Sequence, residues 1–133
     1  MDAGQDLWER VGSCNVAGLT KEKVNFYRRI FETLDIVCLQ ETHGAEKDIR
    51  SRIAKLGFDK GVFSLHTKAT RGSAILWRDS VKQIGAPWTD PQGRIAAVNL
   101  QKEDSPITLV LSVYAPNVDS SKKSHSEYIS FLI

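Results

Sequence analysis

Apolar and polar positions change abruptly at one point of the chain. Positions 36–39, Ile-Val-Cys-Leu, are apolar throughout, and the polar sequence Gln-Glu-Thr-His follows at 40–43. A short continuous apolar run of this kind is typical of a strand that is covered on both faces. Ligand sites in α/β folds gather where strands end, so the Glu41 carboxylate is the first candidate for chemistry.

Two segments have the spacing of amphipathic helices. Thr20 is a suitable N-cap, and the apolar residues after it recur at intervals of three and four. This stripe consists of Val24, Tyr27, Ile30, Phe31 and Leu34. The basic residues beside it, interpreted as a solvated face, are Lys21, Lys23, Arg28 and Arg29. A second helix is predicted from Ile49, Ile53 and Leu56 and ends at Gly57.

The remaining apolar clusters predict short strands, followed by one more helical stretch. We expect strands at 11–15, 36–40, 62–65, 73–77, 94–100 and 107–113, and helical spacing within 120–133. The residues that predict a loop before position 94 are Gly85, Pro87, Asp90, Pro91 and Gly93. Helices therefore come early and strands accumulate later. This order predicts an α+β or layered α/β domain with a mixed sheet, in which helices cover the outer faces.

The composition limits the size, the partners and the location of the protein only broadly. The 133 residues suffice for one modest domain, in which we expect a frayed terminus at 1–9 and ordered structure from 10 to 133. The net charge of +2 permits a polyanionic partner without requiring one. No apolar run approaches the ~20 residues of a membrane span, and the polar N-terminus does not resemble a secretory signal. We therefore expect an intracellular protein, nuclear or cytoplasmic, with no membrane partner and with reduced thiols at Cys14 and Cys38.

Four segments carry a resemblance to a known family. They are 13–19 (Ser-Cys-Asn-Val-Ala-Gly-Leu), 35–43, 71–77 (Arg-Gly-Ser-Ala-Ile-Leu-Trp) and 113–117 (Val-Tyr-Ala-Pro-Asn). In this order and with these separations they resemble the N-terminal half of the endonuclease/exonuclease/phosphatase family. The branch that they resemble most is the apurinic-like endonuclease domain of LINE-type non-LTR retrotransposons. Leu-Gln-Glu-Thr-His and Tyr-Ala-Pro-Asn, as an ordered pair, carry most of the specificity.

The resemblance implies a four-layer α/β-sandwich and a divalent-metal phosphodiesterase that acts on DNA. Glu41 matches the family's metal-binding glutamate, with Mg²⁺ or Mn²⁺ as the cofactor, bound weakly if at all by these residues alone. Asn15 matches the active-site asparagine that orients phosphate and carboxylates. Tyr114 and Asn117 match positions that contact the phosphate. The implied catalytic residues are thus Asn15, Glu41 and Tyr114, and the implied substrate-binding residues are Asn15, Tyr114 and Asn117.

Each of these residues also has a purely structural interpretation. Glu41 could be an exposed acid, and Asn15 a turn former ahead of Gly18. Tyr114 could be a half-buried tyrosine at a strand end, and Asn117 a loop cap. The resemblance favours the site roles over these alternatives.

The departures from the family pattern favour an incomplete site. Ala17 stands where many members have an acidic or polar residue, and the 133 residues contain neither the later Gly-Asp-x-Asn motif nor the terminal Asp-His motif. These motifs supply the aspartate, the second asparagine and the histidine of the family's site. We therefore expect a truncated endonuclease domain that is inactive or nearly so alone, with the second sheet contributed by the missing half.

Two other interpretations remain open. One is a non-catalytic, domesticated fragment that binds nucleic acid or a protein through its open sheet. The other is a small active phosphodiesterase that completes its site by dimerisation. For the truncated domain, exposed sheet edges and the apolar residues Tyr128, Phe131, Leu132 and Ile133 predict self-association.

Overall fold

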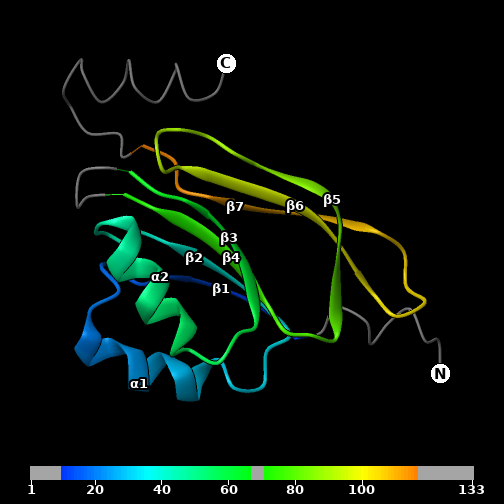
Figure 1. Ribbon diagram of the computed structural model, residues 1–133, viewed down its shortest axis with the longest axis horizontal. Coiled ribbons are helices and arrows are strands. Elements are labelled where there is room, and N and C mark those ends of the chain that lie inside the picture. Colours follow the sequence, from blue (N-terminus) through cyan, green and yellow to red (C-terminus); the bar gives the residue numbers. More distant parts are fainter. Residues whose placement is uncertain (1–9, 67–70, 117–133) are drawn as a thin grey trace.

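The computed structural model describes residues 10–66 and 71–116 (Figure 1). The expectations for 1–9, for Asn117 and for a helix within 120–133 lie outside these residues. The elements, in chain order, are β1 (Val11–Asn15), α1 (Lys21–Ile30), β2 (Ile36–Gln40), α2 (Glu46–Ala54), β3 (Lys60–Ser64), β4 (Ser73–Trp77), β5 (Val81–Thr89), β6 (Ile95–Lys102) and β7 (Thr108–Val113).

The strands form two sheets. Sheet A has the strand order β1-β2-β4-β3, and sheet B has the order β5-β6-β7. β1 and β2 are parallel, as expected for strands joined by a crossover helix, whereas the other neighbours in both sheets are antiparallel. Sheet A is therefore the mixed sheet that the order of elements predicts.

Sheet A lies in the middle of three layers. α1 and α2 cover one of its faces, and sheet B packs against the other (Figure 1). Val37 and Leu39 of β2 point to the helices, and Ile36 and Cys38 point to sheet B. All four are buried, which explains why β2 is a continuous apolar run rather than an alternating one.

Each interface of sheet A has its own core. On the helical side, the buried side chains include Leu19, Val24, Phe31, Ile49 and Leu56. Between the sheets, the buried side chains include Ile75, Trp77, Ala96, Val98 and Leu100. The strand ends that carry polar residues thus belong to a sheet that is fixed from both sides.

Three expectations are corrected. Residues predicted as a loop around Gly85 and Pro87 form β5, in which the pairing with β6 shifts between Ile84 and Trp88. This irregularity accommodates proline, which lacks an N–H, within an edge strand. Ile30, expected in the apolar stripe, is 51% exposed, because it lies on a different side of α1 from the buried residues Val24 and Phe31.

The third correction concerns sheet B. The described residues themselves supply three strands of a second sheet, so the expectation that a missing half contributes this sheet is wrong for these strands. Its outer face is not covered by either of the two described helices, contrary to the expectation of helices on both outer faces (Figure 1). Leu109 and Leu111 of β7 and Trp88 of β5 are each more than half exposed there.

One arginine joins the ends of both helices. The Arg78 guanidinium donates hydrogen bonds to the carbonyl oxygens of Phe31 and Leu34 after α1, at 3.0 and 2.7 Å, and to that of Gly57 after α2, at 2.7 Å. It also lies over the ring of Phe58, 4.2 Å from the centroid. Arg78 therefore ties together the two segments that follow α1 and α2.

No helix in the described ranges has the length and apolar character needed to cross a bilayer.

Candidate active site at the strand ends

Asn15 and Glu41 lie at the same edge of sheet A. The parallel register pairs Asn15 with Gln40, the last residue of β2, and Glu41 follows directly. The Val16 N–H donates to the Gln40 carbonyl oxygen at 3.0 Å, and the Gly18 N–H donates to that of Glu41 at 2.7 Å. β1 and β2 are therefore neighbours, and Asn15 and Glu41 share one rim of sheet A.

Left-handed backbone conformations bring the polar residues to this rim. Ala17, Glu41 and His43 have φ values of +46°, +55° and +50°, although none of them is a glycine. Residues other than glycine enter this region at a cost in free energy, which the surrounding contacts must offset. The polypeptide thus turns sharply in the segments that follow β1 and β2.

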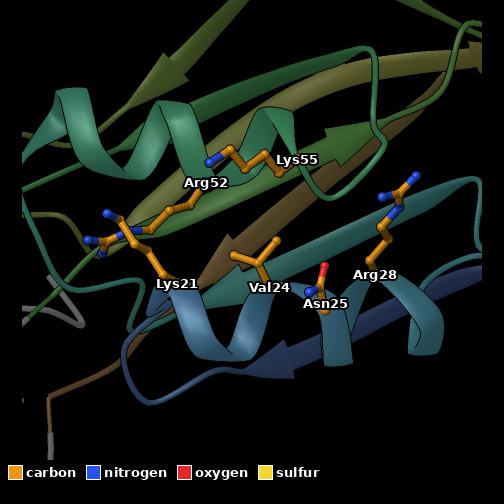
Figure 2. Close-up of a pocket in the computed structure, with 6 residues that line it drawn as sticks. All are labelled: Lys21, Val24, Asn25, Arg28, Arg52 and Lys55. Atoms are coloured by element: carbon orange, nitrogen blue, oxygen red, sulfur yellow. The ribbon is translucent and has the colours of Figure 1, made fainter.

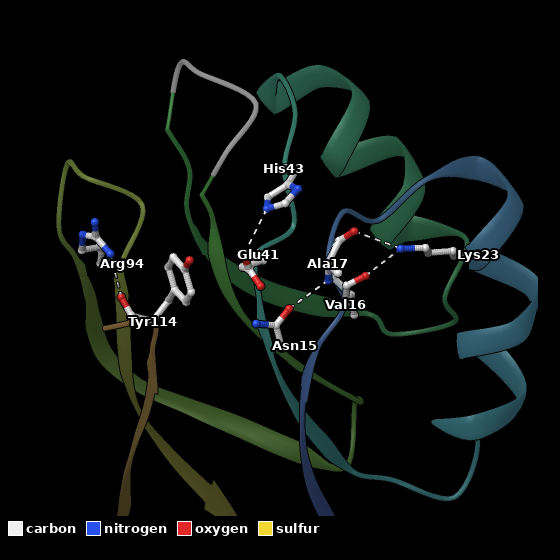
Figure 3. A network of polar contacts seen from close by, with 8 residues as sticks. All are labelled: Asn15, Val16, Ala17, Lys23, Glu41, His43, Arg94 and Tyr114. Atoms are coloured by element: carbon white, nitrogen blue, oxygen red, sulfur yellow. Dashed lines mark hydrogen bonds and ion pairs between the residues drawn. The ribbon is translucent and has the colours of Figure 1, made fainter. Parts of the chain in front are cut away.

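The Asn15 side chain is oriented by its own loop. Its Oδ1 accepts a hydrogen bond from the Ala17 N–H at 2.9 Å, so the Nδ2 amide is the end that remains to donate elsewhere (Figure 3). Lys23 holds the same loop from α1, because its Nζ donates to the carbonyl oxygens of Val16 at 3.0 Å and Ala17 at 2.9 Å. Lys23 was interpreted from sequence as part of a solvated face, and this interpretation is wrong.

His43 is the nearest ionisable neighbour of Glu41. Its Nε2 lies 3.6 Å from Glu41 Oε1, which is within range for an ion pair but too long for a hydrogen bond (Figure 3). The two side chains are 28% and 23% exposed. His43 Nε2 itself is buried and has no hydrogen-bond partner. The pair therefore gives Glu41 a partly desolvated setting, in which one carboxylate oxygen faces a ring nitrogen.

Tyr114 approaches from sheet B. Arg94 Nη1 donates to the Tyr114 carbonyl oxygen at 3.2 Å, and the guanidinium lies over the tyrosine ring, 5.5 Å from its centroid. In the view of Figure 3 the ring stands between Arg94 and Glu41. The strand before it is tied to sheet A, because the Ser112 hydroxyl donates to the Leu39 carbonyl oxygen at 2.9 Å. The structure thus brings Asn15, Glu41 and Tyr114 to one end of the molecule.

Backbone hydrogen bonds connect the two sheets along this rim. The Thr42 N–H donates to the Gly72 carbonyl oxygen at 3.3 Å, and the Gly72 N–H donates to that of Gly93 at 2.9 Å. The Tyr114 N–H completes the series by donating to the Arg94 carbonyl oxygen at 2.7 Å. Gly72 has a φ of +125°, and a Cβ atom there would lie 2.0 Å from Thr42 Oγ1. Only glycine fits at this crossing.

Asp90 organises the loop that carries Arg94. Its Oδ1 accepts hydrogen bonds from the N–H groups of Arg94 and Ile95 and from the Ser64 hydroxyl, each at 2.8 Å. Burial alone would raise the pKa of this carboxyl group, but the hydrogen bonds, the one from Ile95 foremost, hold its pKa below the ordinary value. Asp90 is therefore a charged brace of the loop.

Asp90 and Lys23 were both missed as supports of this site. Asp90 had a weak signal in the turn sequence Asp-Pro-Gln-Gly, whereas Lys23 had none. Lys23 contacts Val16 and Ala17 across the loop between β1 and α1, and Asp90 contacts its own loop and the more distant Ser64.

The described residues supply one clear carboxylate to a metal. No group of three or more His, Cys, Asp or Glu side chains comes together within 10–66 and 71–116. Mg²⁺ is often held by one or two carboxylates, with water and phosphate oxygens completing its octahedron, so Glu41 fits one corner of such a site. The Asn15 Oδ1 is already engaged, and a thiol such as Cys38, whose burial raises its pKa to about 11, does not suit a hard cation.

Similar folds are found in solved structures of AP endonucleases and of a 3′ phosphatase. The structures that match include the AP endonuclease LMAP of Leishmania major (20% identity, TM-score 0.57, covering 92% of this chain and 47% of that one). An AP endonuclease of Archaeoglobus fulgidus matches with 17% identity, a TM-score of 0.64, and coverage of 92% and 47%. The 3′ phosphatase NExo of Neisseria, bound to a product DNA hairpin, matches with 23% identity, a TM-score of 0.63, and coverage of 92% and 49%.

Neither the family models nor the curated proteins contain a match to this sequence. The chain spans about half the length of the solved structures that it resembles. Identities at this level establish the fold alone. With its two sheets, its helical layer and its polar rim at the strand ends, the chain has the fold of the endonuclease/exonuclease/phosphatase proteins.

Proposed function

We propose that these residues form part of a divalent-metal-dependent endonuclease that hydrolyses phosphodiester bonds in DNA. The single observation that supports this most strongly is the shared rim, on which Asn15 and Glu41 end parallel neighbouring strands. The apurinic-like endonuclease of a LINE-type retrotransposon is the source that the sequence motifs favour. DNA is the partner that the resemblance favours, and the protein would act in the nucleus or cytoplasm.

Each rim residue has a role in this proposal. Glu41 holds Mg²⁺ or Mn²⁺, which supplies positive charge to the scissile phosphate when it is bound. Asn15 donates its Nδ2 amide to a phosphate oxygen, and Tyr114 contacts the phosphate from sheet B. Asn117, which the motif also implicates, would contact the same phosphate. His43 stands beside Glu41 and limits the directions from which the carboxylate can be approached.

The proposal also holds that these residues alone are inactive or nearly so. The described rim presents a metal ligand and phosphate-binding groups, whereas a general base for water and a histidine beside the phosphate would have to come from other residues. General acid–base groups contribute factors of ~10²–10⁴, and so does each charge-stabilising donor. The nuclease activity of a chain without these groups should therefore be too low to detect in a nicking assay.

Metal binding tests the role of Glu41 directly. Titration of Mn²⁺, followed by electron paramagnetic resonance, should show weak binding to the unaltered chain and its loss in Glu41→Gln. Glu46→Gln is the matched control, because Glu46 is an exposed carboxylate that pairs with Arg50 on α2. Equal Mn²⁺ binding by the unaltered chain and Glu41→Gln would refute the metal assignment.

Plasmid nicking tests the expected inactivity. In Mg²⁺, the purified chain should not nick supercoiled DNA above the level of Glu41→Ala. Nicking that Glu41→Ala abolishes would show that the site is complete, and would favour the dimeric phosphodiesterase. The nucleotide sequence that follows codon 133 offers a separate test, since an open frame encoding Gly-Asp-x-Asn supports a longer endonuclease.

The second candidate function is non-catalytic binding by a domesticated fragment. It is favoured by the outer face of sheet B, where Leu109, Leu111 and Trp88 are exposed. Apolar patches of this kind often mark surfaces that bind a partner. A stop codon directly after a maintained reading frame would support this function over the first.

A further inference from the structure

A basic pocket lies between the two helices, in the layer away from sheet B. It has a volume of about 330 Å³ and is lined by Lys21, Val24, Asn25, Arg28, Arg52 and Lys55 (Figure 2). Four of these residues belong to α1. Arg52 belongs to α2, and Lys55 is the C-cap of α2. Positions 21, 25 and 28 share one face of a helix, as do 52 and 55, so the spacing directs the cations of both helices to one groove.

The charge of this pocket is uncompensated within the described part of the chain. None of its lining residues is acidic, and the acids of the two helices, Glu22, Glu32, Glu46 and Asp48, do not line it. Arg50 of α2 shows the contrast, because it pairs with Glu46 at 2.8 Å outside the pocket. Four cationic side chains line the groove, with Arg28 towards one end and Lys21 and Arg52 towards the other (Figure 2). With no carboxylate among the lining residues, like charges repel one another along the groove, and a bound anion would reduce this repulsion.

The pocket has fixed as well as exposed parts. Arg52 is half-buried, and its Nη1 donates to the Leu19 carbonyl oxygen at 3.0 Å, which holds the guanidinium at the groove. Val24 is buried and forms an apolar floor. Lys21, Arg28 and Lys55 are exposed along the edges of the groove (Figure 2). An arginine held in this way keeps further N–H donors for oxygen atoms, which it binds in a planar fork.

We propose that this pocket binds a small ligand that carries two or more phosphate groups. The four cationic side chains have donors and no acceptors, so the complementary ligand is rich in acceptor oxygens and highly negative. A single phosphate would satisfy only part of this charge. The volume suits a small molecule in a concave site, and the helical layer is separate from the strand-end rim. The proposal therefore does not depend on the endonuclease function.

Titration calorimetry with inorganic tripolyphosphate at low ionic strength tests the proposal. The unaltered chain should bind it, and Arg28→Gln/Lys55→Gln should weaken binding at least tenfold. Both residues are exposed, so the fold should tolerate their replacement. The matched control is Arg29→Gln/Lys47→Gln, which removes the same charge from exposed positions of the same helices outside the pocket and should bind nearly as the unaltered chain does.

Three results would overturn the proposal. They are no binding of tripolyphosphate at millimolar concentration, an equal loss in the control variant, and binding of a short DNA duplex that depends on Arg28 and Lys55 when tripolyphosphate does not bind. The last result would identify the groove as a nucleic-acid-binding surface. A thermal melt gives a second readout, since tripolyphosphate should raise the Tm of the unaltered chain more than that of Arg28→Gln/Lys55→Gln.

Discussion

Single residues decide how the loops of the candidate site are held. Asp90 is the best example, because one carboxylate oxygen accepts three hydrogen bonds and thereby fixes the loop before β6. That loop presents Arg94, which contacts Tyr114. A side chain far from Glu41 in the sequence thus supports the opposite wall of the same rim.

Replacement of Asp90 by asparagine should lower stability in a pH-dependent way. The folded-state pKa of Asp90 is below its ordinary value, so ionisation stabilises the fold above about pH 4, and this contribution is lost as the pH falls through the folded-state pKa. Asp90→Asn should therefore cost about 1–3 kcal/mol in urea unfolding at pH 7, and the difference should shrink below pH ~4.

Asp104→Asn is the control, because Asp104 is exposed in the turn between β6 and β7. It should leave stability within about 0.5 kcal/mol of the unaltered chain at both pH values. A pH-independent effect of Asp90→Asn would show that its charge is immaterial.

Gly72 is the second residue on which the rim depends. An alanine there would combine a left-handed backbone with a contact of 2.0 Å to Thr42 Oγ1. Gly85→Ala is a matched control, because Gly85 also has a positive φ, +76°, but a Cβ there would meet nothing within 4 Å.

Gly72→Ala should therefore lower the free energy of unfolding by about 1–3 kcal/mol more than Gly85→Ala does. Thr42→Ala, which removes the Oγ1, should restore part of the loss in the double variant. Equal losses in the two glycine variants would mean that backbone strain alone matters and that the contact with Thr42 does not.

At the level of elements, the helices depend on one side chain from outside them. Arg78 follows β4 and donates to carbonyl oxygens beyond the ends of both α1 and α2. Lysine has a single ammonium group and cannot reach this spread of acceptors. Arg78→Lys should therefore destabilise the protein by about 2–4 kcal/mol in urea unfolding, since hydrogen bonds from charged donors contribute about 1.5–3 kcal/mol each and some survive.

Arg50→Lys provides the comparison. Arg50 is exposed, pairs with Glu46 one turn earlier on α2 and lies over the Phe63 ring, 4.7 Å from its centroid. Such contacts at exposed sites contribute about 0.3–0.5 and 0.5–1 kcal/mol, less than several hydrogen bonds from one charged donor. Its replacement should change stability little. Similar losses for both arginines would refute the role assigned to Arg78.

The same elements show what the sequence can and cannot predict. The position of β2 was predictable, because a strand that is covered on both faces appears in the sequence as a continuous apolar run. The position of β1 was predicted as well. β5 was not, because Gly85 and Pro87 are typical of loops, and only the pairing with β6 shows that they form an irregularity within an edge strand. Ile30 was included in the helical stripe but lies on a different side of α1 from Val24 and Phe31.

The candidate site divides in the same way. Asn15 ends β1, and Glu41 and Tyr114 directly follow β2 and β7, so the strand ends and the motifs identified them as candidates. Only the fold shows that all three lie at one end of the molecule. Lys23, Asp90 and Arg78 act through backbone atoms of other segments. Hydrogen bonds of this type depend on loop conformation rather than on residue pattern, and periodicity therefore carries no signal for them.

At the scale of the whole molecule, the outer face of sheet B carries exposed apolar side chains. β7 alternates between buried and exposed positions, and its exposed positions are apolar: Leu109 (59%), Leu111 (53%) and Val113 (43%). Trp88 of β5, 57% exposed, lies on the same side of sheet B, because Ala97 of β6 pairs with both Trp88 and Leu111. We define these four residues as the outer apolar face.

Burial of this face would stabilise any complex that covers it. Each large apolar side chain contributes about 1.5–3 kcal/mol when it is fully removed from water. The edge strand β7 adds unpaired backbone groups, to which another strand could bond. Sheet A has edge strands too, β1 and β3, but α1 and α2 cover its outer face (Figure 1).

The purified chain should therefore self-associate through the outer apolar face. Size-exclusion chromatography with light scattering should show a mass that rises with concentration, and Leu109→Ser/Leu111→Ser should shift the chain toward the monomer. Phe26→Ser is the matched control: Phe26 is 60% exposed on α1, so its replacement removes apolar surface from the opposite layer and should leave association unchanged. A strict monomer with a sharp cooperative melt at every concentration would contradict the prediction, because it would mean that the 133 residues already close their own apolar surface.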